Sequence, residues 1–189
     1  MAKLFSSIDD KLAEWITAQH LFFVATAPSG DDGHVNCSPR SASSLRVLDG
    51  NSVAWLDGVG SGIETVAHLR QNGRIVLMFC AFDGPPRIVR LHGRGTALEA
   101  GDPEFAALRP RFGEQPFAER AIVRVAVSRI GDSCGFGVPL YRYEGERDQM
   151  GKWADKKGRD GAIAYMREKN GASVDGLPGL CWPGDRGRS

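Results

Sequence analysis

Short apolar runs separated by turn-forming residues dominate the first 130 residues of the chain. Runs rich in β-branched and aromatic residues predict strands, and the Asp, Asn, Gly and Pro residues between them predict turns. The expected strands are 22–27, 35–38, 45–47, 53–56, 75–82, 88–97 and 122–130. Because these runs follow one another closely with few helices between them, they predict a mainly β fold, an antiparallel sheet of about six strands closed into a barrel.

Three turn sequences join these strands. "PSGDDG" at 28–33 and "LDGN" at 48–51 consist of residues that tolerate tight or left-handed backbone, so each predicts a hairpin. "DGPP" at 83–86 separates two strongly β-forming runs, and its prolines exclude a continuing central strand.

Helical spacing appears first near the N-terminus. Leu12, Trp15 and Ile16 form an apolar stripe, and Ser7 with Asp10 three positions later predicts the start of that helix. Farther along, apolar residues at helical spacing in the segment 103–120 predict a short helix followed by a loop.

The chain changes character after Ser133. The ranges 146–157 and 160–169 predict two helices, the first of which ends at Gly158. We therefore expect a barrel domain over 1–130 and a helical extension over 131–189 that packs on the barrel.

Composition describes an ordinary globular protein. The 189 residues are 42% hydrophobic and 25% charged, enough for one domain with a sizeable core. The formal net charge of +1 gives no long-range field for nucleic acid or an anionic membrane. Because the chain has neither a signal-peptide pattern nor a run of about 18 apolar residues, we expect a soluble, cytoplasmic protein.

Cysteine usage argues against a metal site. Cys37, Cys80, Cys134 and Cys181 show no CxxC pair and no His at a ligand spacing. In a reducing compartment we expect buried free thiols. The glycines beside Cys134 predict a close approach of backbone to backbone or to a ligand.

The join between a strand and a helix at 52–70 carries the chemistry. The apolar run 53–56 leads into a glycine-rich loop, and Ser61 with Glu64 predicts a capping box and a helix that begins near Gly62. Unpaired amides in the first turn and the helix dipole favour an anion there, such as the phosphate of a nucleotide or flavin. A plain turn is the alternative, and the charge of Glu64 opposes an anion.

The segment 35–98 resembles the pyridoxamine 5'-phosphate oxidase-like family of split barrels that bind flavin mononucleotide (FMN). The matching pieces are "HVNCSPRSASSLRVLDGNSVAWLD", "GSGIETVAHLRQNGRIVLMF" and "PPRIVRLHGRGTALE". The later segment "SCGFGVPLYRYEGERDQMGKWADKKG", residues 133–158, resembles a subgroup of that family. The resemblance implies a six-stranded split barrel with peripheral helices, and FMN bound at a homodimer interface.

The resemblance also implies a set of cofactor-binding residues. They are Arg40, Ser44, Trp55, Leu56, Asp57, Ser61, Gly62, Glu64 and Thr65. The guanidinium of Arg40 suits a phosphate or the carbonyl edge of a flavin. Family oxidases carry Arg and Lys where this chain has Glu64 and Thr65. The phosphate is therefore left to Ser61, Thr65, backbone amides and Arg40, unless the ligand differs.

The resemblance implies an FMN-dependent oxidoreductase that acts on an unknown small molecule. In flavin enzymes the cofactor performs the chemistry, and the protein mainly binds, orients and tunes it. No catalytic residue is assigned. An Arg-x-His arrangement, which binds the substrate in true pyridoxamine phosphate oxidases, does not occur after Arg129, so oxidation of vitamin B6 is not expected. Alternatives are a deazaflavin-dependent reductase, a non-catalytic flavin-binding or haem-binding barrel, and a cofactor-free barrel that binds proteins. We expect His68 to pack at the helix surface.

Overall fold

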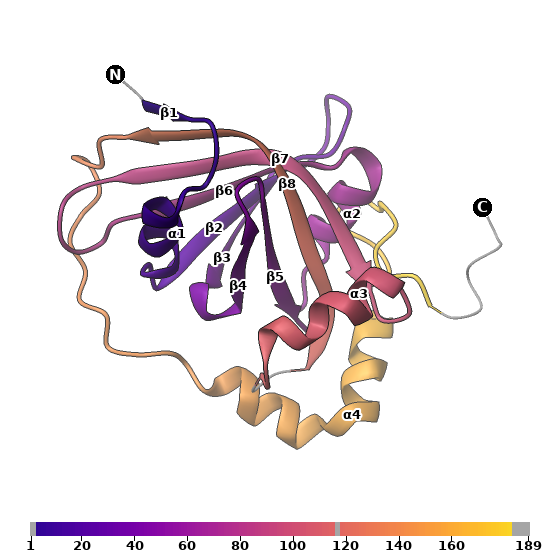
Figure 1. Cartoon of the computed structure of the whole chain (residues 1–189). Coiled ribbons are helices and arrows are strands. Elements are labelled where there is room, and N and C mark those ends of the chain that lie inside the picture. Colours follow the sequence, from indigo (N-terminus) through magenta and orange to yellow (C-terminus); the bar gives the residue numbers. More distant parts are fainter. Residues whose placement is uncertain (1–2, 116–117, 183–189) are drawn as a thin grey trace.

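A single curved antiparallel sheet dominates the computed structural model, which describes residues 3–115 and 118–182 (Figure 1). Its strands are β1 (Lys3–Phe5), β2 (Leu21–Thr26), β3 (Asn36–Ser41), β4 (Leu45–Asp49), β5 (Ser52–Gly58), β6 (Arg74–Cys80), β7 (Ile88–Glu99) and β8 (Glu119–Ser133). The order is β3-β2-β6-β7-β8-β5-β4, with β1 paired to β8.

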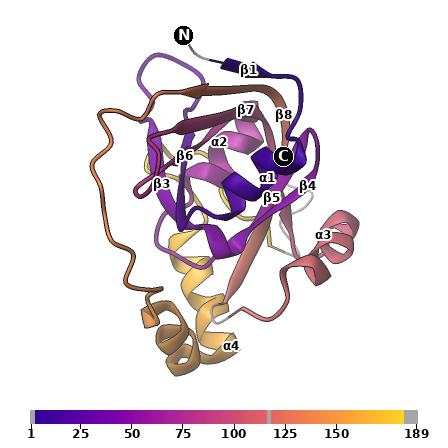
Figure 2. The same ribbon diagram turned by 60° about the vertical axis from the view of Figure 1, so that its left-hand side comes forward.

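The sheet curls into a split barrel, which confirms the predicted fold (Figures 1 and 2). The strands at the two ends of the order, β3 and β4, are joined by the short 3-10 helix η1 (Ala42–Ser44). Over the described residues the sheet has eight strands, whereas a barrel of about six strands was expected from seven predicted strand ranges. The strand absent from the sequence-based prediction is β1, whose three residues are too few to show a pattern.

Period-two alternation explains the strands well. In β2, Phe22, Val24 and Thr26 are buried while the residues between them are partly exposed. The pairing of β7 with β8 shifts register after His92. A Cβ on Gly93 would lie 2.2 Å from the carbonyl oxygen of Ala126, so glycine is required at this bulge.

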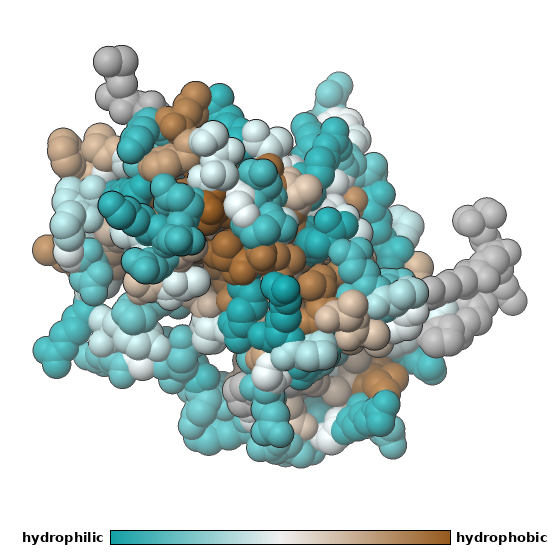
Figure 3. Space-filling view, viewed as in Figure 1, coloured by the Kyte–Doolittle hydropathy of each residue, from teal (hydrophilic) through white to brown (hydrophobic). Residues whose placement is uncertain are grey.

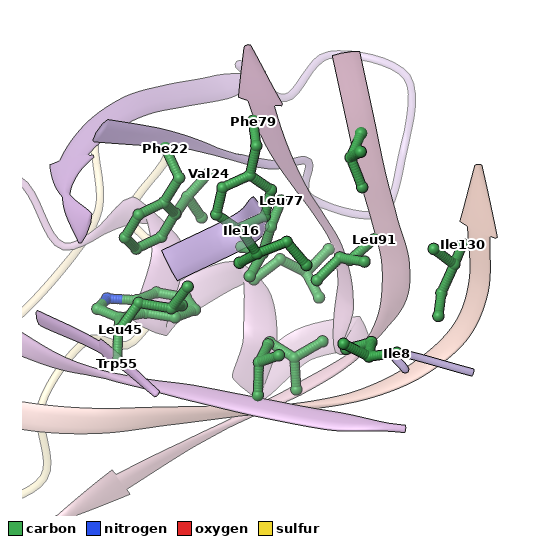
Figure 4. Close-up of a cluster of buried hydrophobic side chains, with 14 of the residues drawn as sticks. Ile8, Ile16, Phe22, Val24, Leu45, Trp55, Leu77, Phe79, Leu91 and Ile130 are labelled. Atoms are coloured by element: carbon green, nitrogen blue, oxygen red, sulfur yellow. The ribbon is translucent and has the colours of Figure 1, made fainter. Parts of the chain in front are cut away.

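The main core fills the barrel, and Figure 4 shows its side chains converging from strands on several sides. The helix α1 (Asp10–Thr17) adds Leu12 and Ile16 to this core, as its apolar stripe predicts. The N-cap of α1 is Asp9, whose carboxylate accepts from the amide of Leu12 at 2.8 Å. The prediction of Ser7 at this position was wrong by two residues, because Asp caps a helix as well as Ser does.

The other helices are α2 (Glu64–Asn72), α3 (Pro103–Leu108) with the 3-10 helix η2 (Arg109–Phe112), and α4 (Gln149–Lys169). The last is interrupted at Gly158, which has φ +64° and ψ 175°. A break at Gly158 was predicted from the sequence. The helix begins at Gln149, after the expected residue 146. The expected loop that ends at residue 120 is shorter, since β8 begins at Glu119.

The C-terminal segment packs against the start of α2. Met166 of α4 and Leu180 form a small core with Val59, Ile63 and Val66. Figure 1 shows the yellow segment beside α2. The sheet itself continues to Ser133. The division into a domain of 1–130 and an extension stays a prediction.

An extended segment, 134–148, runs around the outside of the molecule from β8 to α4 (Figures 1 and 2). A Cβ on Gly135 would lie 2.7 Å from the backbone nitrogen of Arg87, so the close approach expected here is between two backbones. Cys134 and Cys37 are exposed free thiols. The expectation that the cysteines are buried was therefore wrong for these two and holds for Cys80, while Cys181 is partly buried; isolated cysteines give no local signal of burial.

Within residues 3–115 and 118–182, no helix combines the length and apolar character that crossing a membrane requires.

Candidate functional site

A pocket of about 830 Å³ opens between β3, the loop before α2, and the residues that lead into α4. Eight of the nine expected cofactor-binding residues line it: Arg40, Ser44, Leu56, Asp57, Ser61, Gly62, Glu64 and Thr65. The structure thus brings together residues from two strands, a loop and a helix. Whether they bind a cofactor stays a prediction.

Trp55 is the expected residue that does not line the pocket. Its side chain is fully buried in the main core and contacts Phe22 edge to face, with ring centroids 5.8 Å apart (Figure 4). Side chains alternate along a strand, so Trp55 points into the barrel. The structure supports the core role for Trp55 that its large apolar ring favours.

Asp57 lies at the base of the pocket between two arginines. Its Oδ2 accepts from Nε and Nη2 of Arg120 at 2.9 and 2.6 Å, and its Oδ1 lies 3.3 Å from Nε of Arg40. Burial raises the pKa of Asp57, but the charges of Arg120 and Arg40 outweigh burial and hold that pKa below its ordinary value. The carboxylate is therefore ionised and neutralised from two sides.

The glycine-rich loop of residues 58–63 differs from its expected form. The N-cap of α2 is Ile63, which makes no side-chain capping bond, and the helix begins at Glu64. The predicted capping box of Ser61 and Glu64 was wrong, because hydrogen bonds to the loop carbonyls hold the loop in another conformation. Arg120 donates to the carbonyl of Gly62 at 2.6 Å.

Glu64 turns its carboxylate over the loop. One oxygen would lie 2.6 Å from a Cβ on Gly62, and the other accepts from the amide of Val174 at 3.3 Å. The negative side chain occupies the place where the start of α2 would otherwise favour an anion. The charge of Glu64 therefore makes the start of α2 less favourable for a phosphate.

A hydrogen-bonded network joins β3 to α2 at the pocket wall. Nδ2 of Asn36 donates to Oγ1 of Thr65 at 3.1 Å and to Oγ1 of Thr26 at 3.3 Å. The hydroxyl of Ser38 donates to Oδ1 of Asn36 at 2.9 Å. Because Thr65 accepts from Asn36, its own hydroxyl proton is available to a ligand.

His68 lies behind this network. Its side chain is fully buried, and Nδ1 lies 2.9 Å from Oγ1 of Thr26. The expected position at the helix surface was wrong, since α2 packs on this side against β2, to which Thr26 belongs. Burial lowers the pKa of His68, against the attraction of Asp175 and Glu64. Nε2 is buried with no hydrogen-bond partner among the described residues.

The far wall comes from the segment after β8. The ring of Tyr143 stacks on His20, with centroids 3.7 Å apart and planes 4° from parallel. Glu146 accepts from the hydroxyls of Tyr143 at 3.1 Å and Ser41 at 2.8 Å. These contacts fix residues 143–146 against the end of β3. The hydroxyl proton of Ser44 is also used within the protein, since it is donated to the Ser41 carbonyl at 2.8 Å.

The fold and the pocket together define a split-barrel protein with a pocket beside β3 that is lined in part by polar residues. Residues 8–134 match the model of the family described as pyridoxamine 5'-phosphate oxidase. The protein is 38% identical over 196 residues to the pyridoxamine 5'-phosphate oxidase family protein ustO of Aspergillus flavus, covering 95% of this chain and 78% of that protein. The chain belongs to the pyridoxamine 5'-phosphate oxidase family, as the sequence motifs indicated.

Solved structures share the fold. HupZ of Group A Streptococcus matches with a TM-score of 0.52 and 23% identity, over 65% of this chain and 91% of that one. An FMN-binding protein of Syntrophomonas wolfei matches with a TM-score of 0.50 and 18% identity, over 69% of this chain and 85% of that one. At these identities the likeness is one of fold.

Sequence reasoning missed three polar residues of the site: Asn36, Arg120 and Asn170. Arg120 is the second residue of β8, and Asn170 follows a helix that lies beyond the part matched by the family model. Neither position carries a motif. Only the fold shows that they lie below the glycine-rich loop.

Proposed function

We propose that the protein binds FMN in this pocket and acts as an oxidoreductase on a small molecule. The observation that carries the proposal is that eight residues implied by the resemblance to FMN-binding split barrels line one pocket of about 830 Å³. That volume lies within the range of roughly 300–1,000 Å³ typical of small-molecule sites. A protein of the same fold is an FMN-binding protein, which supports the same ligand class.

The donors along β3 and α2 fit such a ligand. Arg40 forms an ion pair with Asp57 through Nε, donates from Nη1 to the carbonyl of Pro39, and lines the pocket. Ser61 is exposed, and Thr65 has a hydroxyl proton to donate. Phosphate and flavin carbonyl oxygens accept from guanidinium and hydroxyl groups, so we assign the phosphate to this side of the pocket and not to Glu64.

When bound, a flavin supplies the electron-transfer chemistry, and the protein binds, orients and tunes it. In this chain, Arg120 and Arg40 neutralise Asp57, so the base of the pocket presents no net negative charge to an anionic ligand. Asn36 fixes the orientation of the Thr65 and Ser38 hydroxyls. No acid–base residue is assigned, and the substrate stays open.

We further propose that the protein is a homodimer with the pocket at the interface. The segment 134–148 exposes Phe136, Leu140 and Tyr141, at 82%, 76% and 64%. Aromatic and aliphatic residues exposed together are typical of a protein contact. Figure 3 also shows hydrophobic surface in the middle of the face that carries β4, β5 and β8.

The first test is the visible spectrum of the purified protein before and after incubation with FMN and desalting. Retained yellow absorption is expected, and nicotinamide donors then serve to test electron transfer. Gly60→Leu probes the location, because Gly60 lines the pocket and nothing lies within 4 Å of an added Cβ. Ala18→Leu is the control, because Ala18 is exposed at the end of α1 and lies outside both the pocket and the segment 134–148.

The expected result is loss of FMN from Gly60→Leu and retention by Ala18→Leu. Equal retention by both variants would contradict this pocket. A colourless wild-type protein that refuses FMN would overturn the proposal, and titration with a deazaflavin and with haem would then separate the remaining alternatives. A protein that holds FMN but oxidises no nicotinamide donor would favour a non-catalytic flavin carrier.

A further inference from the structure

Asn170 connects the C-terminal segment to the loop at the pocket. It is the C-cap residue of α4, and its side chain is fully buried. Its Nδ2 donates to the carbonyl of Gly60 at 2.9 Å and, at 3.5 Å, to that of Ser61. Its Oδ1 accepts from Nη1 of Arg120 at 3.3 Å. Both ends of the amide are therefore used.

Arg120 completes the arrangement from the other side. The same Nη1 donates to the carbonyls of Gly62 at 2.6 Å and Gly60 at 3.3 Å, while Asp57 holds the guanidinium through Nε and Nη2. Three consecutive carbonyls, those of residues 60–62, thus point toward one buried pair of side chains.

The direction of the carbonyls fixes that of the amides. In a planar trans peptide the C=O of one residue and the N–H of the next point in opposite directions, and no cis peptide occurs among the described residues. The N–H groups of Ser61, Gly62 and Ile63 therefore point away from Asn170 and Arg120. Successive amides held in this way form a set of donors for phosphate or carbonyl oxygens.

The residues after α4, 171–182, form a C-terminal tail that holds Asn170 in place. The amide of Leu180 donates to the Asn170 carbonyl at 2.9 Å. A Cβ on Gly179 would lie 2.2 Å from that carbonyl oxygen and 3.0 Å from a side-chain carbon of Ile63, so the tail passes directly over the loop. The amide of Cys181 donates to Glu99 at 2.9 Å, which ties the tail to the barrel.

We propose that Asn170 is a positioning residue of the pocket. With Arg120 it holds residues 60–63 in the conformation that presents their amides to the ligand. The C-terminal segment, which lies beyond the residues 8–134 matched by the family model, is then a working part of the site. The identity of the ligand rests on the proposed function, whereas the effect on the loop does not.

The test uses the ligand-free protein. In ¹⁵N relaxation measurements of the wild type we expect amide order parameters of about 0.85 for residues 60–63. In Asn170→Ala and Asn170→Asp we expect these order parameters to fall below about 0.6. The Asp variant keeps the volume and the acceptor for Arg120 but loses the donor to Gly60. Ser173→Ala is the control, because its hydroxyl accepts only from amides of its own turn.

FMN affinity, measured by fluorescence titration, is expected to weaken about tenfold in both Asn170 variants and to stay unchanged in Ser173→Ala. Unchanged order parameters at residues 60–63 would overturn the proposal, as would a loosened loop with wild-type affinity. If the Ala variant does not fold, the isosteric Asp variant decides. If the wild type binds no FMN, the proposed function fails, and the order parameters still decide whether Asn170 holds the loop.

Discussion

At the scale of single residues, the pocket is electrostatically balanced. Asp57 offsets one of the two positive charges of Arg40 and Arg120, and Glu64 at the mouth of the glycine-rich loop offsets the other. Two charges about 4 Å apart interact by roughly 1 kcal/mol in water and more in a partly buried site. The replacement of a cationic residue by Glu64 therefore weakens, rather than removes, the ability of the pocket to hold a phosphate.

Removal of the Glu64 charge is expected to strengthen FMN binding. In Glu64→Gln the side chain keeps its size but no longer repels a phosphate, so the Kd for FMN should fall roughly tenfold. Riboflavin, which lacks the phosphate, is the matched ligand and its Kd should not change. Fluorescence titration with both ligands gives the ratio, and equal changes for the two would mean that Glu64 does not face the phosphate.

His68 is expected to make stability depend on pH. Its folded-state pKa lies below the ordinary 6.5 because of burial. As pH falls below about 6.5, the unfolded state binds a proton that the folded state refuses, so the free energy of unfolding decreases until the folded-state pKa is reached. This contribution is complete above pH 6.5.

Urea unfolding of the wild type and His68→Gln between pH 7.5 and 5 measures the effect. The curve of the variant should be flatter in the range below pH 6.5. His34, whose pKa is raised by its hydrogen bond to Asp175, contributes with the opposite sign, but it is present in both proteins and cancels in the comparison. Parallel curves for the two proteins would contradict a buried neutral His68.

At the scale of elements, two of the three glycines of α4 have opposite roles. Gly158 has φ +64° and ψ 175°, a conformation that residues with a Cβ rarely adopt, whereas Gly161 has no positive φ. Gly158→Ala should destabilise the protein by about 1 kcal/mol or more, and Gly161→Ala should stabilise it by up to about 1 kcal/mol. Urea unfolding decides, and a stabilised Gly158→Ala would mean that α4 tolerates a straight helix.

The elements show which features a sequence alone can predict. Local patterns gave β2, the stripe of α1 and the break at Gly158, because each depends on residues adjacent along the chain. The family resemblance also pointed to the pocket residues within 56–65, where strand, loop and helix follow one another along the chain. The side chains that fix the loop are not local, since Arg120 and Asn170 lie 58 and 110 residues from the carbonyls they hold.

The same limit explains the errors. The capping box at Ser61 was a sound local expectation, yet the tertiary bonds from Arg120 and Asn170 fix the loop in another form. The exposure of Cys134 and the burial of His68 depend on what packs over them, which no residue spacing shows.

At the scale of the whole molecule, the segment 134–148 exposes the apolar side chains of Phe136, Leu140 and Tyr141 to solvent in the single chain. It forms one wall of the pocket through Tyr143 and Glu146 while its apolar residues face outward. A contact with a second copy would bury those residues and cover the segment that borders the pocket. The dimer and the pocket are therefore expected to depend on each other.

Light scattering after size-exclusion chromatography is expected to give twice the mass of the chain. The double variant Phe136→Glu with Leu140→Glu places charges on residues that are 82% and 76% exposed, so it should shift the protein to a monomer that also loses FMN affinity. Val174→Glu, at a residue 72% exposed on another segment, is the control and should stay dimeric. A monomeric wild type would refute the dimer, whereas a dimer that survives the double variant would place the interface on another surface.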